Sequence, residues 1–270
     1  MNIQYLSDCH IHTDCSPDGA DSAMMMCESA ARLGFYAVAI TDHCECNSYR
    51  KDGYDKSIRQ SCYESRKAAA AFQGRLHVLS GIELGQPMQD PEAAEDVLNC
   101  FSYDFILASL HNIKEKEDFF ELDYSTEKMD VILGRYFDEI MEMIEWGKFD
   151  SLAHLTYPWR YIVGKSGLSI PTSRYLYKIE EVLKSLVRKK IALEVNTSGF
   201  RQKLGVSMPD YPVIRRYREL GGSLITIGSD AHRWADVGGG VEQGLELLRK
   251  AGFQHYAVYS GRKPQFLPVE

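Results

Sequence analysis

Two histidines separated by one residue, His10 and His12, are the first sign of chemistry in this sequence. Alternate residues of an extended strand share a face, so both imidazoles can point toward one metal ion. Taken alone, such a pair is as often structural as functional. The pair follows the apolar run 3–9, which has the character of a β-strand, and this position favours a ligand pair at the end of a strand.

Further residues of metal-binding type follow other short apolar runs, and one lies in a turn after the first run. The nine candidate ligands are His10, His12, Asp18, His43, Glu83, His111, His154, Asp230 and His232. Because about four to six protein ligands suit one or two transition-metal ions, nine ligands predict two or three divalent ions bridged by a carboxylate. Histidine and carboxylate ligands fit zinc, manganese and iron equally well.

The elements that must position these ligands alternate along the chain. The expected strands are 3–9, 36–41, 76–82, 104–109, 150–155, 191–196 and 223–228, and the clearest helices are 21–34, 126–146, 172–190, 209–220 and 241–251. This βα repeat predicts a parallel sheet, most economically an α/β barrel, with a doubly wound open sheet as the alternative. The carboxyl ends of all strands of a parallel barrel meet on one face, so the ligands would converge there. The longest irregular segments, 44–55 and 114–125, both follow strands and would form walls of the site.

The composition sets the class of protein. A length of 270 residues with 44% hydrophobic residues predicts one globular domain over residues 1–270. No run approaches the roughly 20 apolar residues that span a membrane, and the first residues lack an export signal. An odd number of cysteines, seven, predicts a cytoplasmic protein without a disulfide framework. The net charge of −7 argues against nucleic acid as a partner, and the oligomeric state leaves no trace in the sequence.

The ordered set of ligands resembles the PHP (polymerase and histidinol phosphatase) superfamily, most closely its monofunctional histidinol-phosphate phosphatases. The motifs that carry the resemblance are Asp8-Cys9-His10-Ile11-His12-Thr13, Ile40-Thr41-Asp42-His43, Gly81-Ile82-Glu83, Ser109-Leu110-His111 and Gly228-Ser229-Asp230-Ala231-His232. The resemblance implies a distorted (β/α)7 barrel that holds three metal ions. Many superfamily members have histidine where this chain has Asp18, but aspartate also occurs there among the histidinol phosphatases.

The resemblance also implies how the ligands are shared among the three ions. The first ion would be held by His10, His12, Glu83 and Asp230. The second would be held by Glu83, His111 and His154, and the third by Asp18, His43 and His232. Glu83 would then bridge the first two ions.

Two arginines are candidates for binding a phosphate. Arg160 lies six residues after His154, and Arg201 follows the sixth expected strand. Guanidinium groups match phosphate oxygens in geometry and charge, and similar arginines contact phosphate in the family; the alternative is a solvated arginine in a loop. Ser229 is a further candidate for substrate binding, with a structural role about equally plausible. Glu194 is expected to form buried hydrogen bonds rather than to act as an extra ligand.

By resemblance, the expected reaction is hydrolysis of L-histidinol phosphate to histidinol and phosphate in histidine biosynthesis. Our hypothesis is that water activated by metal ions attacks the phosphorus while Arg160 and Arg201 neutralise charge, and that Asp230, His232 or a metal-bound water protonates the leaving oxygen. The residues alone indicate only a phosphoester substrate. The alternatives are a phosphoesterase for nucleotides, oligonucleotides or phosphotyrosine, and a metal-binding domain without catalysis.

Overall fold

The computed structural model describes residues 6–125 and 128–269. Its main sheet consists of parallel strands in the order β1 (Ser7–Ile11), β2 (Ala37–Ile40), β4 (His77–Gly85), β5 (Phe105–Ser109), β6 (Ser151–Leu152), β7 (Ala192–Asn196) and β8 (Ile225–Gly228). The sheet closes on itself because Ile11 pairs with Ala231 and the amide of Asp230 donates to the carbonyl of His10 at 2.8 Å. The predicted distorted (β/α)7 barrel is therefore confirmed, and the open sheet was the wrong alternative.

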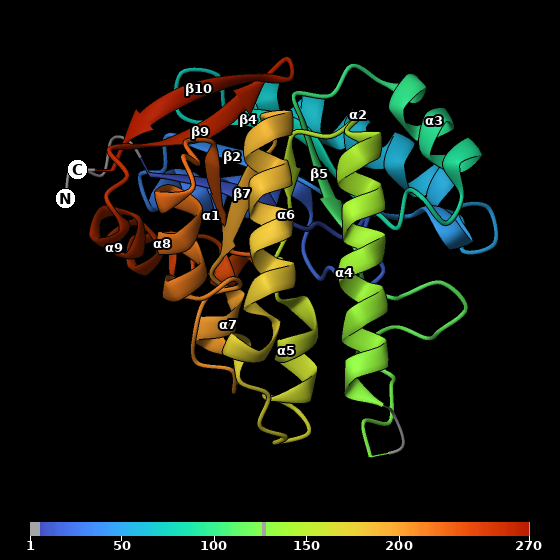
Figure 1. Ribbon diagram of the computed structural model, residues 1–270. Coiled ribbons are helices and arrows are strands. Elements are labelled where there is room, and N and C mark those ends of the chain that lie inside the picture. The colour runs from blue at the N-terminus through green and yellow to red at the C-terminus, as the bar shows by residue number, and fades with distance from the viewer. Residues whose placement is uncertain (1–5, 126–127, 270) are drawn as a thin grey trace.

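Helices surround the strands (Figure 1). They are α1 (Ala23–Arg32), α2 (Tyr54–Ala71), α3 (Pro91–Cys100), α4 (Met129–Trp146), α5 (Tyr157–Ile162), α6 (Leu176–Lys189), α7 (Ser198–Arg201), α8 (Tyr211–Glu219) and α9 (Val241–Ala251). Side chains that cap the first turn fix several of their starts: Ser22 accepts from the amide of Met25 at 3.4 Å, and Asp90 accepts from that of Ala93 at 3.0 Å. None of the helices in the described residues is long and apolar enough to cross a membrane.

Most expected elements lie within a few residues of their predicted positions, although residues 3–5 and 126–127 fall outside the described part of the chain. Arg160 lies on the short helix α5, so the alternative of a solvated arginine in a loop was wrong. Pro158 in the first turn of this helix has the backbone angle that a helix start needs. The segment 44–55 was expected to be irregular, but it overlaps the three-residue strand β3 (His43–Glu45) and includes the first residues of α2, whereas 114–125 forms neither helix nor strand, as expected.

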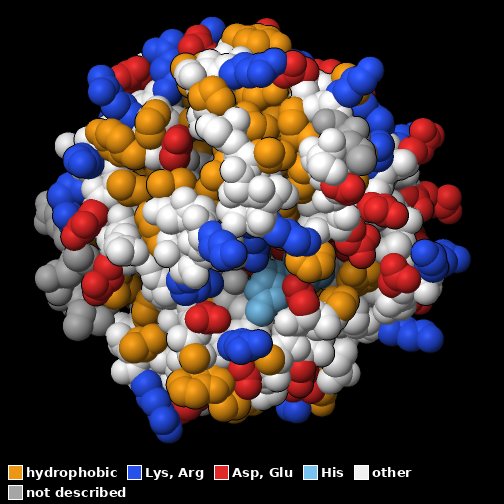
Figure 2. Space-filling model, turned by 90° about the horizontal axis from the view of Figure 1, so that it is seen from below, with side chains coloured by type: hydrophobic (Ala, Val, Ile, Leu, Met, Phe, Trp, Pro, Cys, Tyr) orange, Lys and Arg blue, Asp and Glu red, His pale blue; other side chains and the backbone are white. Residues whose placement is uncertain are grey.

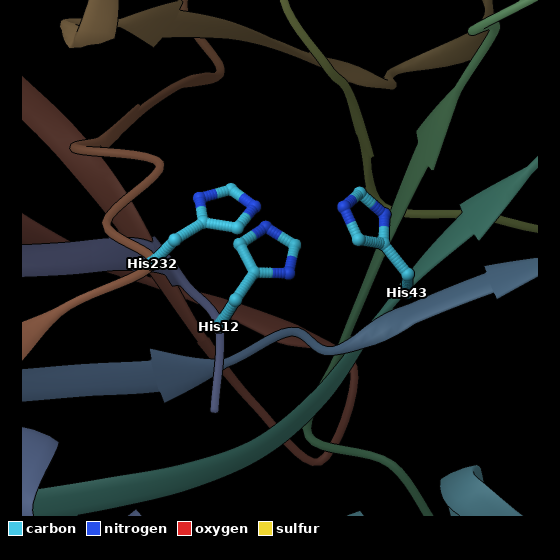
Figure 3. Close-up of side chains that lie close together, drawn as sticks. All are labelled: His12, His43 and His232. Carbon is cyan, nitrogen blue, oxygen red and sulfur yellow. The ribbon is translucent and has the colours of Figure 1, made fainter. Parts of the chain in front are cut away.

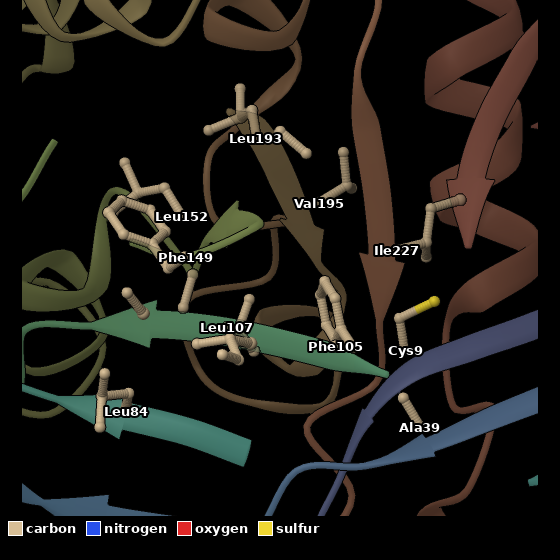
Figure 4. Packing of buried hydrophobic residues seen from close by; sticks show 14 of the residues in the cluster. Cys9, Ala39, Leu84, Phe105, Leu107, Phe149, Leu152, Leu193, Val195 and Ile227 are labelled. Atoms are coloured by element: carbon tan, nitrogen blue, oxygen red, sulfur yellow. The ribbon is translucent and has the colours of Figure 1, made fainter. Parts of the chain in front are cut away.

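The barrel strands separate a polar side from an apolar side. Val195 of β7 and Ile227 of β8 face the surrounding helices and approach Gly244 of α9, where they join the buried core that Figure 4 shows. Their neighbours Glu194 and Gly228 face the opposite side, because side chains alternate along a strand. A Cβ atom on Gly228 would lie 2.2 Å from Cβ of His10, so only glycine lets His10 and Glu194 meet there.

A hairpin of β9 (His255–Ser260) and β10 (Lys263–Pro268) covers the amino-terminal ends of the strands, at the top of Figure 1. Tyr259 stacks on Phe105, with ring centres 5.3 Å apart. Arg262, in the turn of the hairpin, donates from Nε to the Asp150 carboxylate just before β6 at 2.5 Å. This hairpin therefore ties the end of the chain to the barrel.

Replacing Arg262 with alanine is expected to lower the free energy of unfolding by about 1–3 kcal/mol, because the nearly buried carboxylate of Asp150 loses a charged donor. Urea denaturation measures this loss. Arg215→Ala is the matched control, because Arg215 forms an exposed ion pair with Glu219, whose loss should cost less than about 0.5 kcal/mol. Equal losses in both variants would contradict the prediction.

Candidate metal centre

Glu83, at the carboxyl end of β4, is the centre of the candidate site. Its two oxygens face different histidines: Oε1 lies 3.2 Å from Nε2 of His111 and 3.0 Å from Nε2 of His154. Oε2 lies 3.3 Å from Nε2 of His10 and 3.5 Å from Nε2 of His12. A carboxylate placed in this way can bridge two metal ions, one on each side.

His43, His12 and His232 form a second part of the cluster, and Figure 3 shows their rings turned toward one another from three separate segments. The rings of His12 and His232 stack with centres 4.1 Å apart. Asp18 reaches this group from the rim of the pocket: its carboxylate lies 3.0 Å from Nε2 of His232 and 3.6 Å from Nε2 of His43. The aspartate in the turn after β1 is thus brought to the cluster, as expected.

Asp230 completes the set of nine candidate ligands. Its Oδ1 lies 3.6 Å from Nε2 of His12 and 3.8 Å from Nε2 of His10, on the same side as Oε2 of Glu83. The structure therefore brings all nine predicted ligands into one cluster. The sharing of ligands among three ions, which resemblance implied, stays a prediction.

The second nitrogen of most of these imidazoles is held by a neighbouring acceptor. Nδ1 of His10 lies 2.7 Å from Glu194, that of His12 lies 3.1 Å from the hydroxyl of Ser16, and that of His111 lies 3.0 Å from Glu45. Such partners select the tautomer that leaves Nε2 free for a metal. Glu194 forms the buried hydrogen bonds expected of it, whereas sequence reasoning missed Glu45.

The cluster fits metal ions rather than a self-contained network of hydrogen bonds. Within the described residues, four of its buried atoms have neighbours close by but make no hydrogen bond of good geometry: Nδ1 of His43, Oε2 of Glu83, Nδ1 of His154 and Nε2 of His232. Buried polar groups are rarely left in this condition without a ligand. Among the described residues, three groups of ligand atoms are compact enough to hold an ion: His12, His43 and His232; His10, His12 and Glu83; and His43, Glu83 and His111.

The two predicted arginines lie beside Asp230 but differ in exposure to the pocket. Arg160 lines the pocket, and its Nη1 lies 3.3 Å from Oδ2 of Asp230. Arg201 donates to the carbonyls of Ser229 and Gly239, both at 2.8 Å, and so holds the loop after β8. Whether either arginine contacts phosphate stays a prediction, and the geometry favours Arg160.

Ser229 is fully buried, and its hydroxyl donates to Asp8 at 2.5 Å. The amide of Ser229 donates to the same carboxylate at 2.8 Å. Ser229 therefore joins β1 to β8 behind the ligands, which is the structural role left open by the sequence. Substrate binding by Ser229 stays a prediction that this arrangement does not favour.

A pocket of about 750 Å³ leads from the surface to the cluster. Figure 2 shows the histidines at the bottom of a hollow with charged side chains of both signs around it. His43 and His111 line its inner part, Asp18 lies at its rim, and Tyr157 and Tyr161 line it beside Arg160. Residues of both irregular segments form its walls, as predicted: Asn47 and Tyr54 from one segment, and Asp118 and Phe120 from the other, are examples.

Residues 8–198 match the family model described as the PHP domain. This chain belongs to the PHP domain family. The chain is 29% identical over 259 residues to a probable histidinol-phosphatase of Thermotoga maritima, covering 95% of this chain and 96% of that protein. It is 25% identical over 262 residues to a histidinol-phosphatase of Lactococcus lactis, covering 95% of each. The crystal structure of a Lactococcus lactis histidinol phosphate phosphatase with zinc, L-histidinol and phosphate shares the fold of this PHP domain, with a TM-score of 0.76, 22% identity and coverage of 96% and 98%.

Two candidate ligands of the PHP domain have backbones in the left-handed region. The φ angle is 22° at His154, just after β6, and 54° at Asp230, just after β8. These turns bring the side chains back over the ends of the strands. The amide of His154 is held by Glu194, which accepts from it at 2.8 Å.

Metal binding to this PHP domain is expected to release protons. Burial alone would lower the pKa of His111, but Glu45 and Glu83 raise it to about 10, so the metal-free ring is protonated at pH 7. Because a metal must displace that proton, the apparent affinity should rise with pH until the pH passes the raised pKa. Calorimetric titration of metal-free protein with zinc, in buffers of different ionisation enthalpy at one pH, measures the protons released. A binding enthalpy that is the same in all buffers would contradict the prediction.

Proposed function

We propose that this chain hydrolyses L-histidinol phosphate to L-histidinol and phosphate, a step of histidine biosynthesis. The observation that carries the proposal is the gathering of nine metal-binding side chains and Arg160 at the bottom of one pocket. The similarity to proteins named histidinol-phosphatase over almost the whole chain supports the same substrate. An unactivated phosphomonoester is hydrolysed extremely slowly in water, so a site with several cations suits the reaction.

The cofactors in this proposal are two to three divalent ions of zinc, manganese or iron. The three compact ligand groups around Glu83 and His43 would hold them. Bound ions of this kind lower the pKa of a coordinated water toward neutrality and withdraw charge from phosphate oxygens. Zinc is the metal present in the Lactococcus lactis structure.

The protein's own groups would orient the phosphate and stabilise its charge. Arg160 is held beside the cluster by Asp230 and by the rings of Tyr157 and Tyr161, with its guanidinium carbon 6.0 and 5.6 Å from their centres. A guanidinium held in this way needs little reorganisation to bind the equatorial phosphate oxygens in the transition state. Arg201 would act through the loop that it holds.

Asp230 and His232 were both candidates to protonate the leaving oxygen. Burial would raise the pKa of Asp230, but His10, His12 and His232 hold it well below its usual range. An ionised carboxylate can bind a metal or hold Arg160, but it cannot donate a proton. His232 is itself a candidate metal ligand, and its Nδ1 faces the carbonyl of Asp230 at 3.1 Å, so we favour water as the donor.

The outer part of the pocket suits a substrate whose other end is cationic and aromatic. The carboxylate of Asp118 and the rings of Tyr157 and Tyr161 line the pocket around Arg160. L-Histidinol carries an ammonium group and an imidazole, which carboxylates and aromatic faces can bind. An oligonucleotide would bring further phosphates against these carboxylates, so the geometry disfavours a nucleic-acid substrate.

The test is phosphate release from L-histidinol phosphate by metal-loaded protein, compared with phosphotyrosine, nucleoside monophosphates and a short oligonucleotide. We expect the highest kcat/KM with L-histidinol phosphate, loss of activity after chelation and recovery when metal is restored. Preference for another phosphoester would support a catalytic metal site but would contradict L-histidinol phosphate as the substrate. Binding of metal without hydrolysis of any of these esters would instead support the non-catalytic alternative. The cytoplasmic location stays a prediction.

A further inference from the structure

The three-residue strand β3 delivers two polar side chains to the metal centre. Its residues pair with β4 in register, His43 opposite Glu83 and Glu45 opposite Gly85. Because alternate residues share a face, His43 and Glu45 point to the same side, while Cys44 between them is buried on the other. Glu45 is thus placed beside the ligands by the same element that places His43.

Glu45 contacts two of the candidate ligands through one oxygen. Its Oε1 lies 3.0 Å from Nδ1 of His111 and 3.4 Å from Nδ1 of His43. On the opposite side of the His111 ring, Nε2 lies 3.2 Å from Oε1 of Glu83. His111 is therefore held between an outer carboxylate and the central one, with its Nε2 directed to the centre.

The surrounding residues are shaped to hold the Glu45 carboxylate. A Cβ atom on Gly85 would lie 2.2 Å from Oε2 of Glu45, so a larger residue in β4 would displace the carboxylate. The side-chain amide of Gln86 donates to the same oxygen at 2.5 Å. The carbonyl oxygen of that side chain accepts from the backbone amide of His111 at 2.9 Å, so Gln86 holds both partners of the contact.

We propose that Glu45 is a positioning residue of the metal centre: it fixes the ring of His111 for metal binding and links it to His43. The inference rests on the metal-dependent function proposed above. A carboxylate on Nδ1 selects the tautomer with Nε2 free, orients the ring and makes Nε2 a stronger donor to a metal. Glu45 belongs to none of the three compact ligand groups, which distinguishes it from the ligands themselves.

The test uses the full chain with Glu45→Gln and Glu45→Ala. Glutamine keeps the volume but carries no charge, and its NH₂ group would face either Gln86 or His111, both of which donate to the carboxylate. Asp52→Asn is the matched control, because Asp52 lines the same pocket but is exposed. Each protein is stripped of metal, checked for folding by thermal unfolding, and titrated with zinc against a chromophoric chelator without substrate. Steady-state kinetics then follow at increasing zinc concentration.

We expect Glu45→Gln to weaken at least one zinc site about 10- to 100-fold, with a larger loss in Glu45→Ala and none in Asp52→Asn. The kcat of Glu45→Gln should rise as zinc is added, with KM little changed. Unchanged zinc affinity in both Glu45 variants would overturn the inference, as would a raised KM with normal zinc binding, which would place Glu45 against the substrate. Zinc binding is measured without substrate, so the role of Glu45 can be tested even if the protein does not hydrolyse L-histidinol phosphate.

Discussion

Replacing Glu83 with glutamine is expected to lower kcat/KM for phosphoester hydrolysis by at least about three orders of magnitude. Both oxygens of Glu83 face histidines, on opposite sides, at 2.9 to 3.5 Å. An amide keeps the shape but loses the charge that balances two cations, and it can offer only one oxygen as a ligand. Loss of about 4 kcal/mol of transition-state stabilisation corresponds to this factor. Phosphate release together with metal content measures the effect.

Glu121→Gln is the control for this substitution, since Glu121 also lines the pocket but is exposed and contacts none of the ligands. Its activity should stay close to that of the unmodified protein. The bridging role would be refuted if Glu83→Gln kept its full metal content and most of its activity.

Replacing Arg160 with alanine is expected to lower kcat/KM about 10²- to 10³-fold, the effect of removing one preorganised donor to a transition-state oxyanion. Arg160→Lys should recover only part of this loss, because an ammonium group keeps the charge but cannot form two parallel hydrogen bonds to phosphate. Steady-state kinetics measure both variants. Metal content should be unchanged in both, since Arg160 is not a candidate ligand and meets the cluster through an ion pair with Asp230.

Lys116→Met provides the comparison for Arg160, because Lys116 is another cation that lines the pocket but is exposed. We expect a change of less than about threefold, consistent with a weak and screened long-range charge effect. An equal loss in the Lys116 and Arg160 variants would mean that the reaction depends on positive charge in the pocket in general, and not on the position of the Arg160 guanidinium group.

The gathering of the candidate ligands at one site could be predicted from the sequence because strand ends are local features. An apolar run marks each strand, and a parallel barrel turns every carboxyl end to one face, so His111 and Asp230 could be assigned to one site without knowing their distance. Which ligands share an ion could not be predicted from the sequence alone, because this depends on which oxygen of Glu83 each histidine ring faces. That property arises only when the strands take their register.

Other parts of the site left weaker signals. The spacing of His43 and Glu45 is the same as that of His10 and His12, and this pattern was a signal that could have revealed Glu45. The hairpin β9–β10 was missed because it lies outside the βα repeat and its contact between Arg262 and Asp150 joins residues far apart in the chain. Ser229 illustrates the opposite case, since it lies next to Asp230 in sequence but its hydroxyl is turned to Asp8 behind the cluster.

The left-handed backbone at His154 and Asp230 lowers the stability of the fold while it places two side chains that the proposed activity needs. Non-glycine residues in sparsely populated conformations cost of order 1–3 kcal/mol each. Glycine at position 230 would relieve that cost but remove a candidate metal ligand. Glycine substitutions at positions 154 and 230 would therefore raise thermal stability, but the same two side chains are needed for the proposed catalysis. Efforts to stabilise the enzyme should hold both residues constant and seek improvements at the opposite end of the barrel.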